Sequence, residues 1–188
     1  MSRATQILIY LVRRDLRLAD NPILHELARL HGQSQKQFTH VLPVFVFPAE
    51  QVEISGFLSS EHERSPYREA RSAVGGFWRC GKLRAKFLAE SVWDLKQDLE
   101  SVGSGLEIRV GSVQDAVRSI LDGYRERDDA EIHGLWMTSE DAQEEVDEER
   151  QVRNLLHGEN KVFKIWADEK YFVDECVFTS TSALRSLH

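Results

Sequence analysis

A cluster of ionisable side chains lies near the start of the chain, directly after a short apolar run. Arg13, Arg14, Asp15 and Arg17 occupy four of five consecutive positions, and the run before them is Ile7–Val12. A continuous apolar run is typical of a parallel strand that is covered on both faces. The charged turn would then lie at the carboxyl end of that strand, where ligands bind in open α/β sheets. Its side chains could bind an anionic or other polar ligand, or they could form an ion-pair network that only holds the turn.

A second polar turn follows another apolar segment, Leu135–Thr138. Ser139, Glu140 and Asp141 come directly after it. If the strand order is 3-2-1-4-5, it reverses between the first and fourth strands, so the two polar turns would flank one crevice. The second turn also has a structural interpretation. Thr138 with Asp141 three positions later resembles a capping box, and Glu140 would interact favourably with a helix dipole.

The elements that must position these turns are indicated by short apolar runs that alternate with longer amphipathic stretches. This alternation predicts βαβ crossovers and a parallel sheet. We therefore predict an α/β fold: a Rossmann-like, doubly wound, five-stranded parallel sheet in the order 3-2-1-4-5, with helices on both faces. The predicted strands are Gln6–Val12, Val41–Phe47, Glu107–Val110, Leu135–Thr138 and Val162–Trp166, and the predicted helices are Pro22–Leu30, Leu83–Val102, Val113–Arg127 and Asp141–Leu156.

Several helix ends carry residues that can terminate a helix. Asp20 or Asn21 can cap the first helix, Ser112 can cap the third, and Gly103 is placed to end the second. The second helix also carries an apolar stripe at three- and four-residue steps, which predicts a face toward the core. The side chains predicted to be buried there are Phe87, Leu88, Val92, Leu95, Leu99 and Val102.

Length and composition bound what the chain can be. With 188 residues, 41% of them hydrophobic and 29% charged, the chain can form one globular domain with a core. Residues 1–90 carry 13 Lys and Arg against 9 Asp and Glu, whereas residues 91–188 carry 11 against 22. Because phosphate binding needs a cationic face, we expect no strong DNA binding. The connection at 48–81 is much longer than the roughly 2–6 residues usual in α/β units, which favours an exposed, mobile loop.

The sequence carries no pattern typical of export or membrane insertion. No apolar run approaches the ~20 residues of a membrane span. The first strand begins too early for a signal or transit peptide. Cys80 and Cys176 are isolated, and no histidine pair has metal-ligand spacing, so no metal site is predicted. We expect an intracellular protein, cytoplasmic or nuclear, that does not bind membranes.

Two sequence blocks resemble a known family. The run Arg-Arg-Asp-Leu-Arg-Leu-x-Asp-Asn-Pro at residues 13–22 resembles the opening of the photolyase/cryptochrome family. Cys80–Leu95, followed by Val102–Leu106, is similar to the DASH branch of that family. The family usually has Lys-Thr-Gly where this chain has Arg79-Cys80-Gly81, so the hydroxyl of that motif is missing.

The resemblance implies an antenna-binding α/β domain at residues 1–167 and the start of an interdomain linker at 168–188. In the family, a larger helical domain follows and carries FAD, which supports blue-light-dependent DNA repair or photoreception. We therefore expect this chain to lack that domain, to bind FAD only if it is supplied, and to be inactive as a catalyst alone. The implied antenna is methenyltetrahydrofolate, whose pterin edge presents parallel donors to a carboxylate. The resemblance assigns that carboxylate to Glu140, with Ser139 and Asp141 as neighbours.

Two other functions are compatible with the residues. A nucleotide-binding module could use the same crevice, although the turn after the first strand is rich in arginine instead of glycine. A ligand-free interaction domain could associate through the face that would meet the helical domain. Its candidate residues are Phe172, Val173, Val177 and Phe178. The antenna could also be a deazaflavin, and the residues do not separate repair from signalling.

Overall fold

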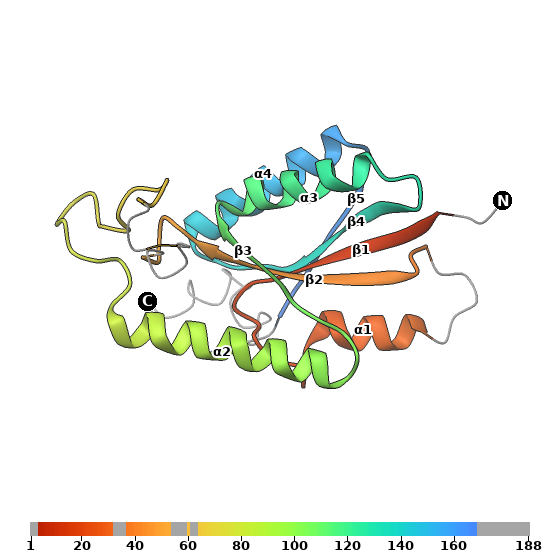
Figure 1. The fold of residues 1–188 in the computed structure, drawn as a ribbon, viewed down its shortest axis with the longest axis horizontal. Helices are drawn as coiled ribbons and strands as arrows, with labels where there is room; N and C mark the ends of the chain where they lie inside the picture. The colour runs from red at the N-terminus through yellow and green to blue at the C-terminus, as the bar shows by residue number, and fades with distance from the viewer. Residues whose placement is uncertain (1–3, 32–36, 54–59, 61–63, 169–188) are drawn as a thin grey trace, which may run out of the picture.

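The chain folds around one five-stranded parallel sheet, as seen in a computed structural model that describes residues 4–31, 37–53, 60 and 64–168 (Figure 1). The strand order is β3-β2-β1-β4-β5, and every neighbouring pair is parallel. The predicted fold class and strand order are therefore confirmed. The strands are β1 (Thr5–Val12), β2 (His40–Pro48), β3 (Glu107–Gly111), β4 (Ala130–Thr138) and β5 (Val162–Trp166), and the helices are α1 (Pro22–His31), α2 (Lys82–Ser101), α3 (Val113–Arg125) and α4 (Gln143–Gly158).

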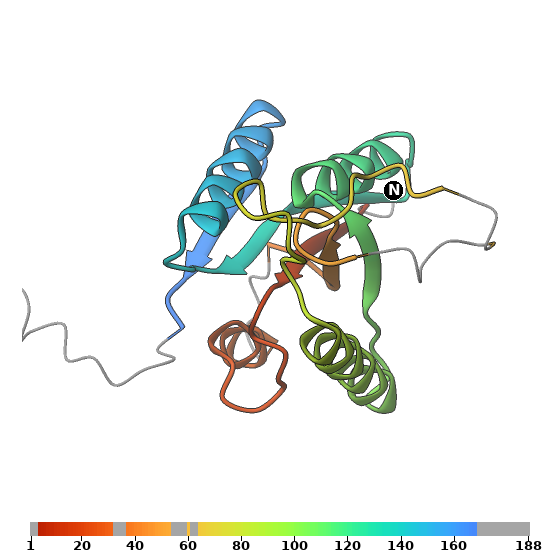
Figure 2. The same cartoon turned by 90° about the vertical axis from the view of Figure 1, so that its left-hand side faces the viewer.

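The central strand β1 is buried on both faces because helices cover the sheet from two sides. Helices α3 and α4 lie on one face, and α1 and α2 lie on the other (Figures 1 and 2). Ile7, Ile9 and Leu11 of β1 pack in the core under α3 and α4, whereas Leu8 and Tyr10 pack in the core over α1 and α2. This two-sided burial explains why β1 reads as a continuous apolar run.

The predicted helix ends are confirmed in three places. The Oδ1 atom of Asn21 accepts the backbone N–H groups of Ile23 and Leu24, both at 3.0 Å, so Asn21 caps α1. The hydroxyl of Ser112 accepts the N–H of Asp115 at 3.1 Å and caps α3. Gly103 follows α2 with a φ of 78°, which glycine adopts at low cost.

Two of the side chains predicted to be buried on the second helix are exposed, and Leu88 is only partly buried. Phe87 is 71% exposed, and Val102, which follows the last residue of α2, is also 71% exposed. The start of α2 extends beyond the carboxyl ends of the strands (Figure 1). The sheet therefore covers only the later part of the stripe, where Val92, Leu95 and Leu99 are buried.

The described parts of the connection from β2 to α2 are mostly exposed, as expected. Arg71 and Trp78 form an isolated antiparallel bridge, and the Arg71 guanidinium lies 3.9 Å from the centroid of the Trp78 ring. The predicted linker beyond residue 168, with its four apolar interface candidates, lies outside the described residues. Among helices within the described residues, none has both the length and the apolarity to cross a bilayer.

Candidate functional site

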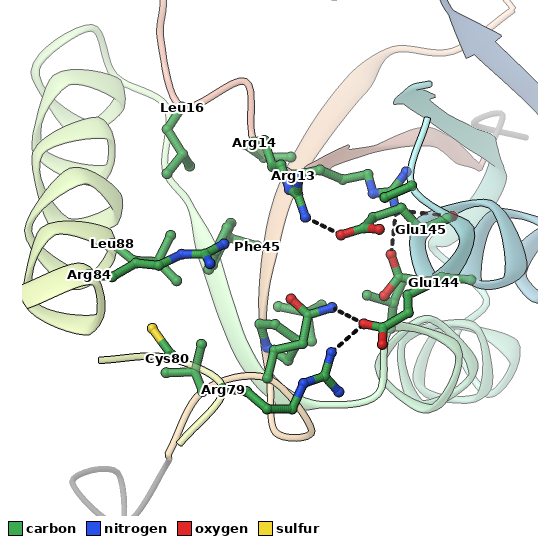
Figure 3. A pocket seen from close by; sticks show the side chains of 18 of the residues that line it. Arg13, Arg14, Leu16, Phe45, Arg79, Cys80, Arg84, Leu88, Glu144 and Glu145 are labelled. Atoms are coloured by element: carbon green, nitrogen blue, oxygen red, sulfur yellow. Dashed lines mark hydrogen bonds and ion pairs between the residues drawn. The ribbon is translucent and has the colours of Figure 1, made fainter. Parts of the chain in front are cut away.

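A pocket of about 590 Å³ opens at the carboxyl ends of β1 and β2, between the first turns of α2 and α4 (Figure 3). Such a volume falls within the range of small-molecule sites. Apolar side chains from three segments form part of the wall: Val12, Leu16, Phe45, Val52, Phe87 and Leu88. The charged side chains in the lining are Arg13, Arg14, Arg79, Arg84, Glu144, Glu145 and Glu148.

Arg13 is the buried cation of this site. Its guanidinium donates to the backbone carbonyls of Thr138 at 3.4 Å and Glu145 at 3.2 Å. It also donates to the Glu148 carboxylate at 2.7 Å, and its side chain is only 6% exposed. Arg13 therefore ties the end of β1 to the end of β4 and to the first turns of α4.

Arg14 lies beside Arg13 and also faces α4. It forms an ion pair with the buried Glu145, and its own side chain is half exposed. Figure 3 shows this pair facing the pocket, to which both residues contribute. The charged turn therefore has the features of both interpretations that the sequence left open. Its ion pairs with α4 hold the turn, and Arg13 and Arg14 also line a cavity.

Asp15 lies in a fully buried hydrogen-bond network and does not line the cavity. Its carboxylate accepts the Tyr10 hydroxyl at 2.5 Å, the backbone N–H of Arg13 at 2.9 Å, and the side-chain amide of Asn21 at 3.2 Å. Burial, followed by the neighbouring Asp15 charge, raises the pKa of Tyr10 far above its ordinary value. The network connects β1, the charged turn and the cap of α1.

Arg17 does not line the pocket, and its side chain instead contacts the segment after β5. Its guanidinium donates to both carboxylate oxygens of Asp168, at 3.1 and 2.7 Å, and to the carbonyl of Asp20. The hydrogen bond that Arg17 donates to Asp168 is the main cause that raises the pKa of Arg17. This bidentate pair joins the β1–α1 turn to the residue two positions after β5.

The second polar turn is arranged differently from the prediction. Helix α4 begins at Gln143 with Ala142 as its N-cap and no side-chain cap, so the predicted capping box is wrong. Thr138 ends β4 fully buried, and its hydroxyl has no hydrogen-bond partner among the described residues. The helix starts two residues later than predicted because β4 and the following turn continue through Asp141.

Ser139, Glu140 and Asp141 lie in the connection between β4 and α4 and are absent from the lining of this pocket. The backbone N–H of Ser139 donates to the carbonyl of Trp166 at 2.9 Å, which fastens the connection to β5. Of the six candidate residues, Arg13 and Arg14 line the cavity, and Asp15 accepts a hydrogen bond from the backbone N–H of Arg13. A ligand role for Glu140, Ser139 and Asp141 stays a prediction.

Helix α4 presents three carboxylates to the pocket, Glu144, Glu145 and Glu148, that were not among the predicted site residues. The Glu144 carboxylate accepts hydrogen bonds from the side chains of Gln51 at 3.2 Å and Arg79 at 2.5 Å. Glu144 therefore links α4 to two other segments of the pocket lining (Figure 3). The spacing of the three carboxylates could have indicated a shared helix face, because residues three and four apart are neighbours on a helix. Within the described ranges, no group of three or more potential ligands is arranged to hold a metal ion.

Glu148 makes the stability of the site sensitive to pH. Burial is the largest cause that raises its pKa above the ordinary 4.5, and Arg13 opposes it. The unfolded chain therefore ionises first, and native stability is lost as pH rises from about 4.5 through the folded pKa. We expect the free energy of unfolding of Glu148→Gln, relative to that of the native sequence, to rise with pH across this window. Urea unfolding at several pH values measures this difference.

Glu131 supplies a control of opposite sign for that experiment. Its pKa is lowered, chiefly by the hydrogen bond from Lys161. The native sequence should therefore gain stability over Glu131→Gln as pH rises through the same range. Parallel pH dependences for the two variants would contradict the role assigned to Glu148.

Comparison with known proteins identifies the family of this chain. A model of the DNA photolyase family matches residues 8–174. A protein of Gibberella zeae named as a cryptochrome DASH is 47% identical over 170 residues, which cover 90% of this chain and 24% of that protein. A protein of Neurospora crassa named as a mitochondrial cryptochrome DASH is 44% identical over 171 residues, covering 91% of this chain and 22% of that protein.

Solved structures show the same fold. The cryptochrome of Synechocystis superposes with a TM-score of 0.67 at 22% identity, covering 89% of this chain and 28% of its own. A class III photolyase of Agrobacterium tumefaciens gives a TM-score of 0.58 at 17% identity. The chain spans 22–24% of the length of its two similar DASH relatives. The family match over most of the chain and these relatives show that the chain belongs to the DNA photolyase family and is DASH-like.

Proposed function

We propose that this chain is the antenna-binding domain of a DASH-type protein and that the pocket holds the antenna chromophore. The observation that carries the proposal is the pocket itself, which opens at the carboxyl ends of β1 and β2 and reaches the start of α4, beside the point between β1 and β4 where the strand order reverses. Ligands of open α/β sheets bind at this point of the topology. Its wall combines apolar side chains with a few convergent polar groups, as small-molecule sites do.

Methenyltetrahydrofolate is the antenna that we propose. A pterin ring is flat and apolar on its faces, and it presents N–H donors along one edge. Phe45 and Leu88 could contact the faces, while Glu144 and Glu145 offer carboxylate oxygens to the edge. The pocket carboxylates thus fit the role that the resemblance assigned to Glu140, and the two assignments make different predictions.

Blue-light-dependent DNA repair or photoreception is proposed for the whole protein of this type and not for the chain alone. The FAD that supports these reactions would be bound by a helical domain. We propose that the same domain also contacts the antenna. The isolated chain should therefore bind folate weakly, because it lacks part of the contacts while the entropic cost of ordering the ligand remains.

The test is titration of the purified chain with methenyltetrahydrofolate at equilibrium, monitored by absorbance. We expect saturable binding, seen as a saturable change in the folate band in the near ultraviolet. Glu144→Gln should weaken binding by about tenfold, because an amide replaces one acceptor oxygen with a donor. The matched control is Asp147→Asn, on the same helix but outside the pocket lining and paired with Arg150.

Glu140→Gln separates the two assignments. Loss of binding in this variant, with Glu144→Gln unaffected, would support the prediction made from the resemblance and move the site toward the β4–α4 connection. Absence of saturable binding at high folate concentration would overturn the assignment of methenyltetrahydrofolate as the antenna. Protection of the fold by ATP, with none by folate, would favour a nucleotide-binding module.

A further inference from the structure

The charges around the pocket do not cancel. Each of the three carboxylates in the lining already has a cationic partner. Glu144 pairs with Arg79 at 2.5 Å, Glu145 pairs with Arg14, and Glu148 pairs with Arg13. A fourth cation in the lining, Arg84, has no counterpart among them.

Arg84 lies in the first turn of α2, opposite the carboxylates of α4. Its side chain reaches from α2 toward Phe45 in the pocket (Figure 3). In the part of the chain that the structure describes, no carboxylate lies within 4 Å of its guanidinium nitrogens. The side chains beside it in the lining include the apolar Phe87 and Leu88. The site therefore has an excess of positive charge on the α2 side only.

The surroundings of Arg84 strengthen this positive potential. Helix α2 begins at Lys82, and its N-cap Gly81 makes no side-chain cap. No acidic residue lies in its first turn. The positive end of the helix dipole and the Lys82 ammonium therefore act in the same direction as Arg84.

We propose that the pocket selects an aromatic ligand that carries an anionic group, a carboxylate or a phosphate, and that Arg84 binds this anion. The inference rests on the proposed function, since it assumes that the pocket holds a small aromatic molecule. The inference also assigns an orientation to the ligand in the pocket. The anion lies against α2, and the edge of the ring with N–H donors faces the carboxylates of α4. A guanidinium can bind either oxyanion with two parallel hydrogen bonds.

Pairs of ligands that differ only in the anionic group test this inference. Riboflavin and FMN differ by a phosphate, and 6-hydroxymethylpterin and pterin-6-carboxylate differ by a carboxylate. The complete chain is titrated with each compound while ligand fluorescence is followed. At low ionic strength, we expect the anionic member of at least one pair to bind about tenfold more tightly than the neutral one. Because Arg84 is exposed, this preference should shrink as salt is added.

Arg84→Gln should abolish the preference for the anionic member of each pair. Arg84→Lys should retain part of it, since a lysine keeps the charge but not the planar pair of donors. The matched control is Lys82→Gln, which removes the same charge from the same helical turn without touching the pocket lining. It should keep most of the preference.

The outcomes separate the two proposals. Binding without preference for the anionic member of either pair, or a preference that survives in Arg84→Gln, would overturn this inference and leave the proposed function standing. If folate, both flavins and both pterins all fail to bind, the proposed function fails and this inference fails with it. A preference seen only within the carboxylate pair would identify the ligand as a folate-like acid. A preference seen only within the phosphate pair would identify it as a nucleotide-like ligand.

Discussion

Replacing Asp15 with alanine should lower the free energy of unfolding by about 3 kcal/mol, because it leaves several buried donors without an acceptor. The Asp15 carboxylate is fully buried and accepts Tyr10 Oη–H, the N–H of Arg13 and the Asn21 amide. These donors come from the central strand, the charged turn and the cap of α1. Loss of the acceptor should therefore also displace Arg13 and Arg14 from the pocket and weaken ligand binding.

Chemical denaturation and ligand titration of the same variants would check this result. Tyr10→Phe removes one hydroxyl and keeps the ring in the core, so its cost should be smaller, about 1 kcal/mol. In a double-mutant cycle, the costs of Tyr10→Phe and Asp15→Ala should be less than additive because the two groups share a hydrogen bond. A cost of Asp15→Ala no larger than that of Tyr10→Phe would contradict this description of the network.

Arg13→Met should destabilise the chain by a similar amount, about 3 kcal/mol, for an electrostatic reason. The substitution leaves the partly buried Glu148 carboxylate without its cation, and the carbonyls of Thr138 and Glu145 without their donor. The methionine fills much of the volume of the arginine stem, so lost packing contributes little. The cost should grow as pH rises above 4.5, because Glu148 then ionises in the unfolded chain.

The double variant Arg13→Met with Glu148→Gln separates charge from shape. Removing the uncompensated carboxylate should restore part of the lost stability at neutral pH, as measured by urea unfolding. The matched comparison is Arg150→Met, which breaks an exposed pair with Asp147 on the same helix. It should cost less than about 1 kcal/mol. A double variant as unstable at pH 7 as Arg13→Met would show that the carbonyl bonds of Arg13 dominate.

The fold could be predicted from the sequence because the signals that specify it are local. The apolar run of β1 indicates burial on both faces, and alternating short and long apolar segments indicate βαβ units. Asn21, Ser112 and Gly103 mark helix ends through contacts with residues only a few positions away. The charged turn at residues 13–17 could be placed at the carboxyl end of the sheet for the same reason.

Local patterns were misleading where an element meets solvent or another segment. The apolar stripe of α2 identifies a face, but it does not indicate how far the sheet extends beneath that face. Val102 is therefore exposed although its spacing matches that of its buried neighbours, and Phe87 is exposed at the pocket. The sequence Thr138–Asp141 matches a capping box, yet β4 and its turn occupy these residues and α4 begins later.

Gly134 shows a constraint that no local pattern reveals. A Cβ atom at this position would lie 2.3 Å from the carbonyl oxygen of Val162, on the neighbouring strand β5. Nothing in the residues around Gly134 indicates that another strand passes so closely. Only the pairing of β4 with β5 requires a glycine here.

By itself, the sequence determined the class of the fold and the place of the charged turn, because these depend on periodicity and capping within short windows. The strand order was predicted correctly, but it is realised only by pairing between distant segments. The tertiary structure alone decided which side chains form the pocket. Arg13, Arg84 and Glu144 come from three separate segments, and they meet only after β1, α2 and α4 have packed on the sheet. Pairing three of the pocket cations with carboxylates and leaving Arg84 unmatched is a property of that long-range arrangement.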